Sequence, residues 1–265
     1  MPELPEVEAA RRKMERALAG RRLAAVHARD DPIVFAEVTA RTFARRLRGR
    51  RVVGSGRYGK HFWLELDERP WPVMHLGMTG TIEVYDREAD RPKFWKAEYV
   101  TDSGTRVAVT NKRRLGRLRL RDDPRNQRPI SELGFDPLLD LPTARKIGEQ
   151  LGRRSSPIKA VLLDQGFAAG VGNWVADEVL YQARIAPRLR ADELTAEQVR
   201  QLRQKLRSVV RKAVEVDADA RRFPRTWLFH HRWGRNAQAR TARGERVIHQ
   251  TIAGRTTAWA PQRQT

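Results

Sequence analysis

The spacing of apolar side chains divides the chain into a stretch of short strands followed by a stretch of helices. Residues 6–19 carry apolar side chains at helical intervals, which predicts a helix near the start. Residues 22–121 then alternate or run apolar in short segments separated by glycine-containing turns, which is typical of strands. The expected strands include 61–66, 73–76, 81–85, 98–100 and 106–109. Several short strands at close spacing indicate an antiparallel sandwich or barrel.

The second half of the chain carries the spacing of helices. Residues 196–215 hold apolar side chains at helical intervals, and Thr195 with Gln198 three positions later is the signature of a capped helix start. The pattern therefore predicts a long helix over 196–215. Two shorter helices are expected at 157–164 and 174–183, with a glycine-rich turn between them.

A β-hairpin is predicted to close the chain. Residues 246–250 and 255–259 read as its strands, around a turn at Ala253 and Gly254. The change from strands to helices predicts an α+β protein with two domains. The expected parts are an antiparallel β-sandwich with flanking helices at 1–125, a linker at 126–142, a helical domain at 143–220 and the hairpin segment at 221–265.

The charge of the chain indicates a polyanionic partner. It has 53 Lys and Arg against 32 Asp and Glu, a net charge of +21. Nucleic acid presents a dense row of phosphates and is the first candidate. We expect no membrane association, because no apolar run reaches the ~18 residues of a spanning helix and no signal peptide is seen. Cysteine is absent, which excludes disulfides, thiolate metal sites and a thiol nucleophile.

The first residues of the chain offer an unusual nucleophile. Met1 precedes a small residue, so we expect its removal, which would leave Pro2 with a free secondary amine. An α-amino group titrates near pH ~8, so part of it is unprotonated at neutral pH. Such an amine can attack a sugar carbon and form an iminium ion, with Glu3 and Glu6 close enough in sequence to move protons. The ordinary alternative is a lead-in to a helix, because proline suits a first helical turn.

Four further segments suit contacts with nucleic acid, although each also has an ordinary structural reading. Residues 170–173 form a glycine-rich entry to a helix, where N–H groups can bind phosphate; a plain capped turn is the alternative. Met78 lies on a glycine-flanked turn and could wedge into a base stack or simply fill a core. Lys60 and the cations of residues 112–116 could contact phosphates or be solvated.

These segments together resemble the formamidopyrimidine-DNA glycosylase/endonuclease VIII family of base-excision repair enzymes. The matching blocks are residues 2–8, the segment around Lys60, and residues 75–80, 112–116 and 170–178, in the family's order along nearly the whole chain. The likeness is closest to plant-type formamidopyrimidine-DNA glycosylases and their bacterial relatives, on residues 163–166, 177–184 and 213–219. It implies a helix–two-turn–helix element in the helical domain.

The resemblance implies roles for four residues of the first domain. Pro2 matches the catalytic N-terminal proline that forms a Schiff base, and Glu3 matches the proton donor for opening of the sugar ring. Glu6 matches a buried carboxylate that supports the catalytic segment. Lys60 matches the lysine of β,δ-elimination, which also holds a phosphate at the lesion.

The resemblance also implies contacts with DNA. Met78, Arg113 and Leu115 match the residues that fill the gap left by a flipped nucleotide, with the arginine facing the orphan base. The family usually has Phe in place of Leu115, so the wedge is expected to stack less well. The remaining positions matched to DNA contacts are Asn173, His75 and Lys159, of which Asn173 is the phosphate-binding residue of the helix–two-turn–helix.

The end of the chain departs from many relatives, which hold an arginine-bearing hairpin with four cysteines and zinc. Arg255 matches that arginine, so the resemblance implies a zincless finger held by packing. The histidines His230, His231 and His249 are a weak alternative, because structural zinc sites use cysteine. The short segment 217–229 lacks the long lesion-capping loop of relatives with strong 8-oxoguanine activity. This implies better use of formamidopyrimidines, oxidised pyrimidines or abasic sites.

The implied function is a bifunctional DNA glycosylase and AP lyase without metal or other cofactor. Its partner would be double-stranded DNA that contains oxidised bases or abasic sites. We expect a cytoplasmic, nucleoid-associated monomer in a bacterium. Two alternatives stay open: an inactive DNA-binding or nucleoid protein on the same scaffold, and an RNA-binding protein, because charge alone does not separate DNA from RNA.

Overall fold

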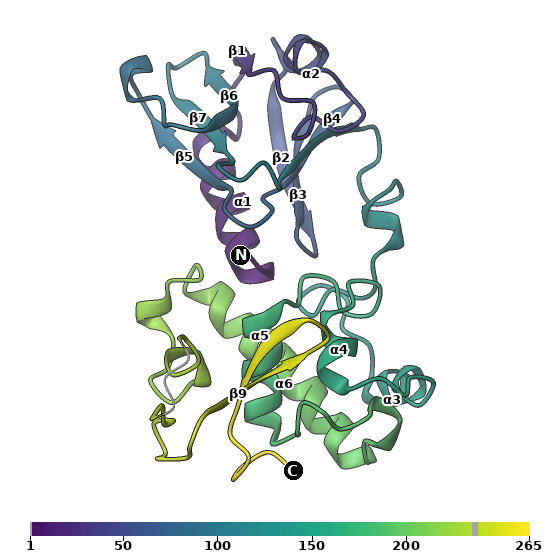
Figure 1. Cartoon of the computed structure of the whole chain (residues 1–265). Coiled ribbons are helices and arrows are strands. Elements are labelled where there is room, and N and C mark those ends of the chain that lie inside the picture. Colours follow the sequence, from purple (N-terminus) through teal and green to yellow (C-terminus); the bar gives the residue numbers. More distant parts are fainter. Residues whose placement is uncertain (1, 235–237) are drawn as a thin grey trace. The chain divides into compact units, whose positions relative to one another are not determined.

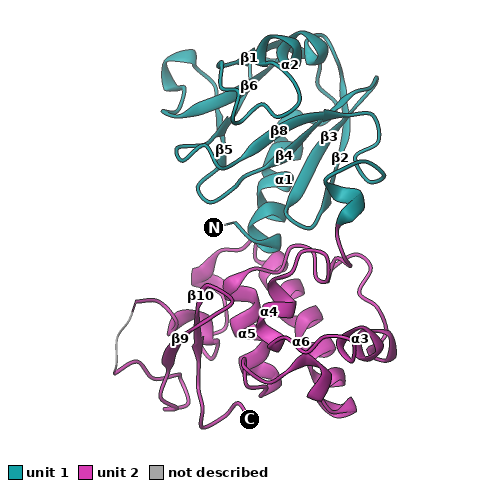
Figure 2. Ribbon diagram, turned by 45° about the vertical axis from the view of Figure 1, so that its right-hand side comes forward, with its two compact units in different colours: residues 1–132 teal, residues 133–265 magenta. Residues whose placement is uncertain are grey.

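The computed structural model describes residues 2–234 and 238–265, which form two compact units (Figure 2). Unit 1 comprises residues 1–132 and unit 2 residues 133–265. Strands dominate unit 1 and helices unit 2, in the order traced in Figure 1. The α+β fold class predicted from the sequence is confirmed. The predicted removal of Met1 concerns a residue outside the described part of the chain.

Unit 1 contains two four-stranded antiparallel sheets. One sheet has the order β1-β6-β7-β5, formed by Leu23–Ala28, Trp95–Thr101, Arg106–Thr110 and Thr81–Tyr85. The other has the order β2-β3-β4-β8, formed by Val52–Tyr58, His61–Leu66, Trp71–His75 and Arg117–Arg121. Helices α1 (Leu4–Leu18) and α2 (Ala40–Leu47) flank them, with the short 3₁₀ helices η1 (Glu88–Asp90) and η2 (Ile130–Glu132).

A large hydrophobic core joins the two sheets of unit 1. Helix α1 contacts β2 and β3 of one sheet and β5 and β7 of the other. Its Val7, Met14 and Leu18 are buried because they recur on one helical face, and they pack with inward residues such as Phe62 and Tyr99 from the two sheets. The burial of this face fixes α1 against the sheets, and with it the first turn that carries Pro2 and Glu3.

Helix α2 lies in a region that we expected to be strands, and that expectation is wrong there. Thr39 caps the helix, because its Oγ1 accepts the Thr42 N–H at 3.1 Å. Phe43 and Leu47, four residues apart, are buried on one face. Three arginines in eight residues mask this spacing, so the segment reads as polar until the cap and the apolar pair are recognised.

Unit 2 is built around a buried central helix, α5 (Asn173–Ala183), which contacts α4 (Ile158–Leu163), α6 (Ala196–Glu215) and strand β10 (Arg255–Trp259). The predicted limits of α6 are confirmed, and its start is fixed by the expected capping box of Thr195 and Gln198. The other elements are α3 (Ala144–Leu151), η3 (Ala191–Glu193), η4 (Ala220–Arg222), η5 (Leu228–His230), β9 (Ile248–Ile252) and β10 (Arg255–Trp259).

The closing hairpin is present, but its first strand lies two residues later than predicted. Ala253 and Gly254 have φ of 48° and 70°, so both residues of the two-residue turn are left-handed, as in a type I′ hairpin. This turn pairs Arg255 with Ile252 and Trp259 with Ile248. Because the length of the turn fixes the pairing register, the first strand ends at Ile252 and begins at Ile248. No helix in the described part of the chain is both long and apolar enough to cross a membrane.

Candidate functional site

The first turn of α1 fixes the position of the residues that follow Met1. Glu3 is the N-cap of the helix and is buried. Its backbone N–H donates to Glu6 Oε2 at 2.9 Å, and its carboxylate accepts the Glu6 N–H, so the two residues form a capping box. Pro2, which is half-buried, therefore precedes a rigid helix start with a carboxylate directly after it.

Glu6 is half-buried, which differs from the buried carboxylate that we expected. The buried carboxylate of the capping box is its partner Glu3, which is only 2% exposed. Glu6 nevertheless supports the catalytic segment as expected in one respect: its carboxylate accepts the backbone N–H of Glu3 and so fixes the residue after Pro2.

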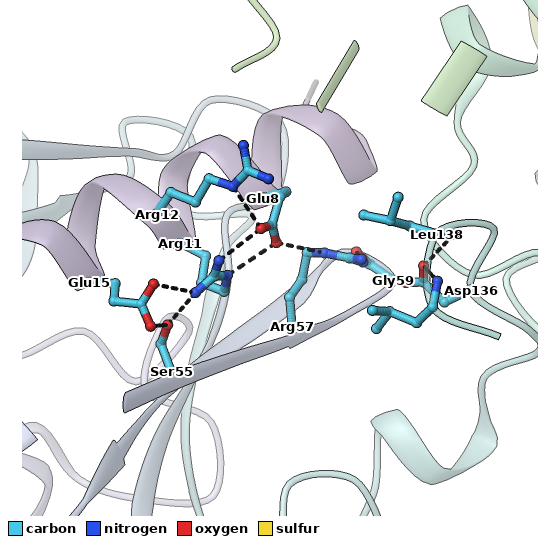
Figure 3. A network of polar contacts seen from close by, with 10 residues as sticks. Glu8, Arg11, Arg12, Glu15, Ser55, Arg57, Gly59, Asp136 and Leu138 are labelled. Atoms are coloured by element: carbon cyan, nitrogen blue, oxygen red, sulfur yellow. Dashed lines mark hydrogen bonds and ion pairs between the residues drawn. The ribbon is translucent and has the colours of Figure 1, made fainter. Parts of the chain in front are cut away.

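A network of buried charges ties α1 to the turn between β2 and β3 (Figure 3). Arg57 is 5% exposed; its Nε donates to Glu8 Oε2 at 3.1 Å and its Nη1 to the Gly59 carbonyl at 3.0 Å. Glu8 also pairs with Arg11 and Arg12. Burial alone would raise the pKa of Glu8, but hydrogen bonds and charges from the three arginines outweigh it and lower the pKa.

This network fixes the turn that carries Lys60. Gly59 has a φ of 57°, which a residue with a Cβ adopts only with strain, and it begins the two-residue loop between paired Tyr58 and His61. Arg57 Nη1 donates to the Gly59 carbonyl and so holds the loop backbone. Lys60 is half-buried and follows at the second loop position, on a backbone that is anchored to α1 through Glu8. Sequence reasoning missed Arg57 and Glu8 as supports.

Two histidines with rings in tilted contact, His61 and His75, lie on β3 and β4, and His61 directly follows Lys60. The rings of His61 and His75 have centroids 4.8 Å apart on paired strands. Burial, followed by neighbouring positive charges that include Lys60, lowers the pKa of His61 to about 3 and that of His75 to about 4. Both rings are therefore neutral at pH 7. His75 Nδ1 accepts the Gly77 N–H at 3.3 Å, which leaves the proton on Nε2 as a neutral donor.

Two loops of unit 1 bring the expected wedge residues together. Met78 is 36% exposed on the loop between β4 and β5, and Leu115 is 42% exposed on the loop between β7 and β8. Asn111 joins the loops: its Nδ2 donates to the Leu76 carbonyl at 2.9 Å and its Oδ1 accepts the Leu115 N–H at 3.0 Å. A Cβ on Gly77 would lie 2.4 Å from the Leu115 carbonyl carbon, so only glycine permits this approach.

The structure separates the roles of the two arginines in the second loop. Arg114 is bound to buried Asp31, with Nε and Nη2 contacts at 3.0 Å, and Lys96 pairs with the same carboxylate at 2.7 Å. Burial opposes ionisation of Asp31, but these partners lower its pKa to about 2. Arg113 is exposed and forms no ion pair with any described residue. Arg114 therefore has a structural role, and Arg113 is the arginine of this loop whose charge is not paired with a described residue.

In unit 2, a glycine-rich turn leads into α5 at Asn173. Gly170 has a φ of 90°, and Gln165 closes the turn, with its Oε1 accepting the Gly170 N–H at 3.0 Å and its Nε2 donating to Val171 at 2.8 Å. Asn173 Nδ2 donates to the Thr256 carbonyl of β10 at 2.8 Å. Asn173 therefore binds the hairpin with one amide hydrogen and keeps the second as a donor.

Lys159 was expected to contact DNA, and the structure contradicts this. Its side chain is 0% exposed, and its Nζ pairs with Asp177 and donates to the Asn173 carbonyl at 3.0 Å. The ammonium is thus directed to the interior, where it supports the residue that begins α5. This burial could not be predicted from the residues near Lys159, because Asp177 lies 18 positions further along the chain.

Arg255 is exposed at the first position of β10, directly after the hairpin turn. The short segment before the hairpin packs aromatic rings against Trp174 of α5, with Phe223 and Phe229 centroids 5.5 and 5.1 Å away. Within the described residues no group of three or more potential metal ligands gathers. His249 instead contacts the Arg232 carbonyl at 3.1 Å.

Comparison with known families covers both units. A model described as the formamidopyrimidine-DNA glycosylase N-terminal domain matches residues 1–118. A second, described as the formamidopyrimidine-DNA glycosylase H2TH domain, matches residues 133–224. Together they include the candidate site residues of unit 1 and the turn and helix of Asn173.

Two relatives that match along the whole of this chain are formamidopyrimidine-DNA glycosylases. A formamidopyrimidine-DNA glycosylase from Arabidopsis thaliana is 40% identical over 277 residues, which cover 100% of this chain and 71% of the plant protein. One from Heliobacterium modesticaldum is 32% identical over 281 residues, which cover 100% of both. These relatives come from a plant and a bacterium.

Solved structures share the fold. Lactococcus lactis formamidopyrimidine-DNA glycosylase non-covalently bound to DNA with an AP site has a TM-score of 0.88 at 23% identity, over 99% of both chains. The wild-type L. lactis enzyme with DNA containing N7-benzyl-Fapy-dG has a TM-score of 0.88 at 24% identity, over 100% of both chains.

Proposed function

Because this chain belongs to the formamidopyrimidine-DNA glycosylase family, and is thus a base-excision repair glycosylase, we propose that it also cleaves the abasic site it creates. The substrate would be double-stranded DNA with formamidopyrimidines, oxidised pyrimidines or abasic sites, and more weakly 8-oxoguanine. Residues 1–125 would supply the chemistry, residues 143–220 the helix–two-turn–helix and residues 221–265 the zincless finger.

The proposed reaction begins at the amine of Pro2. The nitrogen attacks C1′ of the damaged nucleotide, Glu3 protonates the opening sugar ring, and the base leaves. The resulting iminium ion withdraws electrons and acidifies the C2′ hydrogen, so loss of that proton expels the 3′ phosphate. A second elimination expels the 5′ phosphate, and hydrolysis returns the amine. The iminium ion serves as the electron sink of both eliminations.

DNA binding would use both units. The target nucleotide must leave the stack before C1′ can be attacked, and Met78, Arg113 and Leu115 would occupy its place. The exposure of these three side chains on loops joined by Asn111 supports this role. Lys60, the neutral His75 Nε2–H and the second amide hydrogen of Asn173 would bind phosphates, with Arg255 at the lesion.

The observation that carries the proposal is the capping box at the start of α1. It holds a buried carboxylate, Glu3, immediately after the residue whose amine would attack, at the beginning of a helix packed into the core. A proton donor beside a nucleophile on a rigid element is the arrangement that this chemistry requires.

Borohydride trapping tests the proposal. Protein whose N-terminus has been checked by mass spectrometry is incubated with abasic-site duplex and borohydride, which reduces the iminium to a stable covalent adduct. We expect an adduct and strand cleavage with wild type. Pro2→Gly, which keeps only a primary amine, should lower adduct formation on the order of 10²-fold or more, because a less well placed nucleophile loses its proximity advantage.

The same assay separates the alternatives. An inactive DNA-binding protein would bind the abasic duplex without an adduct, and an RNA-binding protein would prefer a matched RNA. Absence of adduct from processed protein would contradict the proposal. A panel of lesion duplexes tests the substrate order, and equal turnover of 8-oxoguanine:cytosine and formamidopyrimidine duplexes would overturn it.

A further inference from the structure

Asp177, in the middle of α5, is a buried carboxylate surrounded by donors from three other parts of unit 2. It is 1% exposed. One oxygen pairs with Lys159 of α4. The other accepts Arg232 Nη2 at 2.6 Å and Nε at 3.2 Å, and also the backbone N–H of Ala258 at 3.2 Å. One side chain thus gathers α4, the segment that precedes the hairpin, and strand β10.

These contacts hold both strands of the hairpin. Ala258 belongs to β10 and is bound directly. Strand β9 is bound through Arg232, whose carbonyl accepts His249 Nε2–H at 3.1 Å. On the other side, Lys159 donates to the Asn173 carbonyl, and the Asn173 side chain donates to Thr256 of β10. The hairpin is therefore linked to α5 by two routes, one at Asp177 in the middle of the helix and one at Asn173 at its start.

The buried charges of this cluster depend on one another, so replacement of the carboxylate leaves both cations without their anion. Asp177 carries one negative charge against the two positive charges of Lys159 and Arg232, all three of them buried. Removal of the carboxylate would leave two buried cations close together, whereas burial of a charge is tolerated only with a partner. The packing around the hairpin therefore requires the carboxylate of Asp177.

We propose that Asp177 is a positioning residue that holds the β9–β10 hairpin, and hence Arg255, in register on α5. The inference rests on the proposed function for the part played by Arg255. In a zinc finger, four thiolates bind one metal cation. Here four N–H donors bind one carboxylate anion.

The position of Arg255 depends directly on this anchor. Ala258 lies three residues after Arg255 on the same strand, at a rise of about 3.3 Å per residue. A slip of one residue would turn the Arg255 side chain to the opposite face of the hairpin. The Ala258 contact fixes the strand along its length, and the Thr256 contact fixes it close to the turn.

Hydrogen exchange measures the anchoring without any DNA. In the full chain with Asp177→Asn, which keeps the shape and removes the charge, we expect amides of 248–259 to exchange on the order of tenfold faster or more, because a hydrogen bond to a charged group contributes about that factor. Amides of α1 in unit 1 should keep wild-type rates. Unchanged exchange in the hairpin would overturn the proposal.

Kinetics then test whether Asp177 acts through Arg255. With wild type active, Asp177→Asn should lower kcat/KM on abasic duplex on the order of 10- to 100-fold, as expected for a misplaced contact. In an Arg255→Ala background the same change should have little further effect, because the residue it positions is gone. Losses that multiply would overturn the proposal. If wild type forms no adduct, the proposed function is contradicted. The hydrogen-exchange result alone then decides whether Asp177 holds the hairpin.

The neighbouring carboxylate provides the matched control. Glu178 is equally buried on α5, but its bonds go to Gln182 and to the Phe229 N–H rather than to the hairpin strands. Glu178→Gln should leave kcat/KM unchanged and should not make the hairpin amides exchange faster. If Asp177→Asn does not fold, Asp177→Leu combined with Lys159→Met removes two of the buried charges and the strand contact. The double variant is then judged by the same two criteria.

Discussion

Glu3 and Glu6 belong to one helical turn, yet the structure gives them different tasks. Glu3 is buried next to Pro2, whereas Glu6 is half-buried and its carboxylate already accepts the Glu3 N–H. Glu3 is therefore the better placed to deliver a proton to a sugar attached to Pro2. In the proposed reaction, Glu6 would act only through the backbone of Glu3, whose N–H it accepts.

Glu3→Gln should separate the two halves of the reaction. The amide keeps the size of the side chain but has no proton to deliver, so base excision from a formamidopyrimidine duplex should fall on the order of 10²–10⁴-fold. Cleavage of a preformed abasic site should fall less, because its base has already left. Single-turnover assays on the two substrates measure the difference.

Glu15→Gln is the control for this prediction. Glu15 lies on the same helix and pairs with Arg11, away from the first turn. Its replacement should change neither rate appreciably. Equal losses on both substrates with Glu3→Gln would argue that Glu3 only supports the fold.

At the residue scale, the sequence predicts those site residues whose role is local. Pro2 and Glu3 could be proposed because their chemistry depends on adjacent positions. Asn111, Arg57 and Asp177 could not, because their contacts join segments 35, 49 and 81 positions apart. Lys159 was misjudged for the same reason: nothing near it in the sequence shows the carboxylate that draws it inward.

At the scale of elements, prediction succeeded where a pattern was long or a turn was marked. Helix α6 has the predicted limits because its helical periodicity is uninterrupted, and strands β3 and β5 have them because turn residues precede both. Helix α2 was missed, because three arginines among its eight residues mask the apolar spacing of Phe43 and Leu47. The packing of α5 could not be predicted either. A helix that is buried on nearly all sides has no exposed polar face to reveal its orientation.

Helix α5 also carries a titrating group that should affect the stability of the protein. Glu178 is buried, which raises its pKa from 4.5 to about 7, although bonds from Gln182 and the Phe229 N–H partly oppose the shift. Between those pH values the folded chain holds a proton that the unfolded chain has lost. The contribution of Glu178 to the free energy of unfolding is thus complete below pH 4.5 and falls as pH rises to about 7.

Glu178→Gln should remove this dependence, because the amide resembles the neutral acid. Relative to wild type, the variant should gain about 3 kcal/mol in the free energy of unfolding from the acidic to the neutral end of this range. Urea unfolding of both proteins, followed by circular dichroism at several pH values, measures the difference. Parallel curves for the two proteins would show that Glu178 titrates normally in the folded state.

For the whole molecule, the surplus of 21 positive charges bears on how DNA is bound. Cations that neutralise phosphates release counterions, so affinity falls with salt by about 0.9 log units per log unit for each phosphate. The charge is carried by exposed arginines and lysines in both units, and most of them have no role in the chemistry. Binding is therefore expected to be largely blind to sequence, with the lesion recognised after contact.

Salt should thus weaken binding without slowing the chemical step. With about six phosphates neutralised, affinity for duplex DNA should fall about 10³-fold between 50 and 200 mM salt, for damaged and undamaged duplex alike. The rate of adduct formation at saturating enzyme should change little, because amine attack on C1′ neutralises no phosphate. Arg113→Ala should weaken binding to lesion DNA yet keep the slope, since this residue is assigned to a base. A flat salt dependence with both duplexes would mean that phosphate contacts supply little of the binding energy and that the basic surface serves another partner.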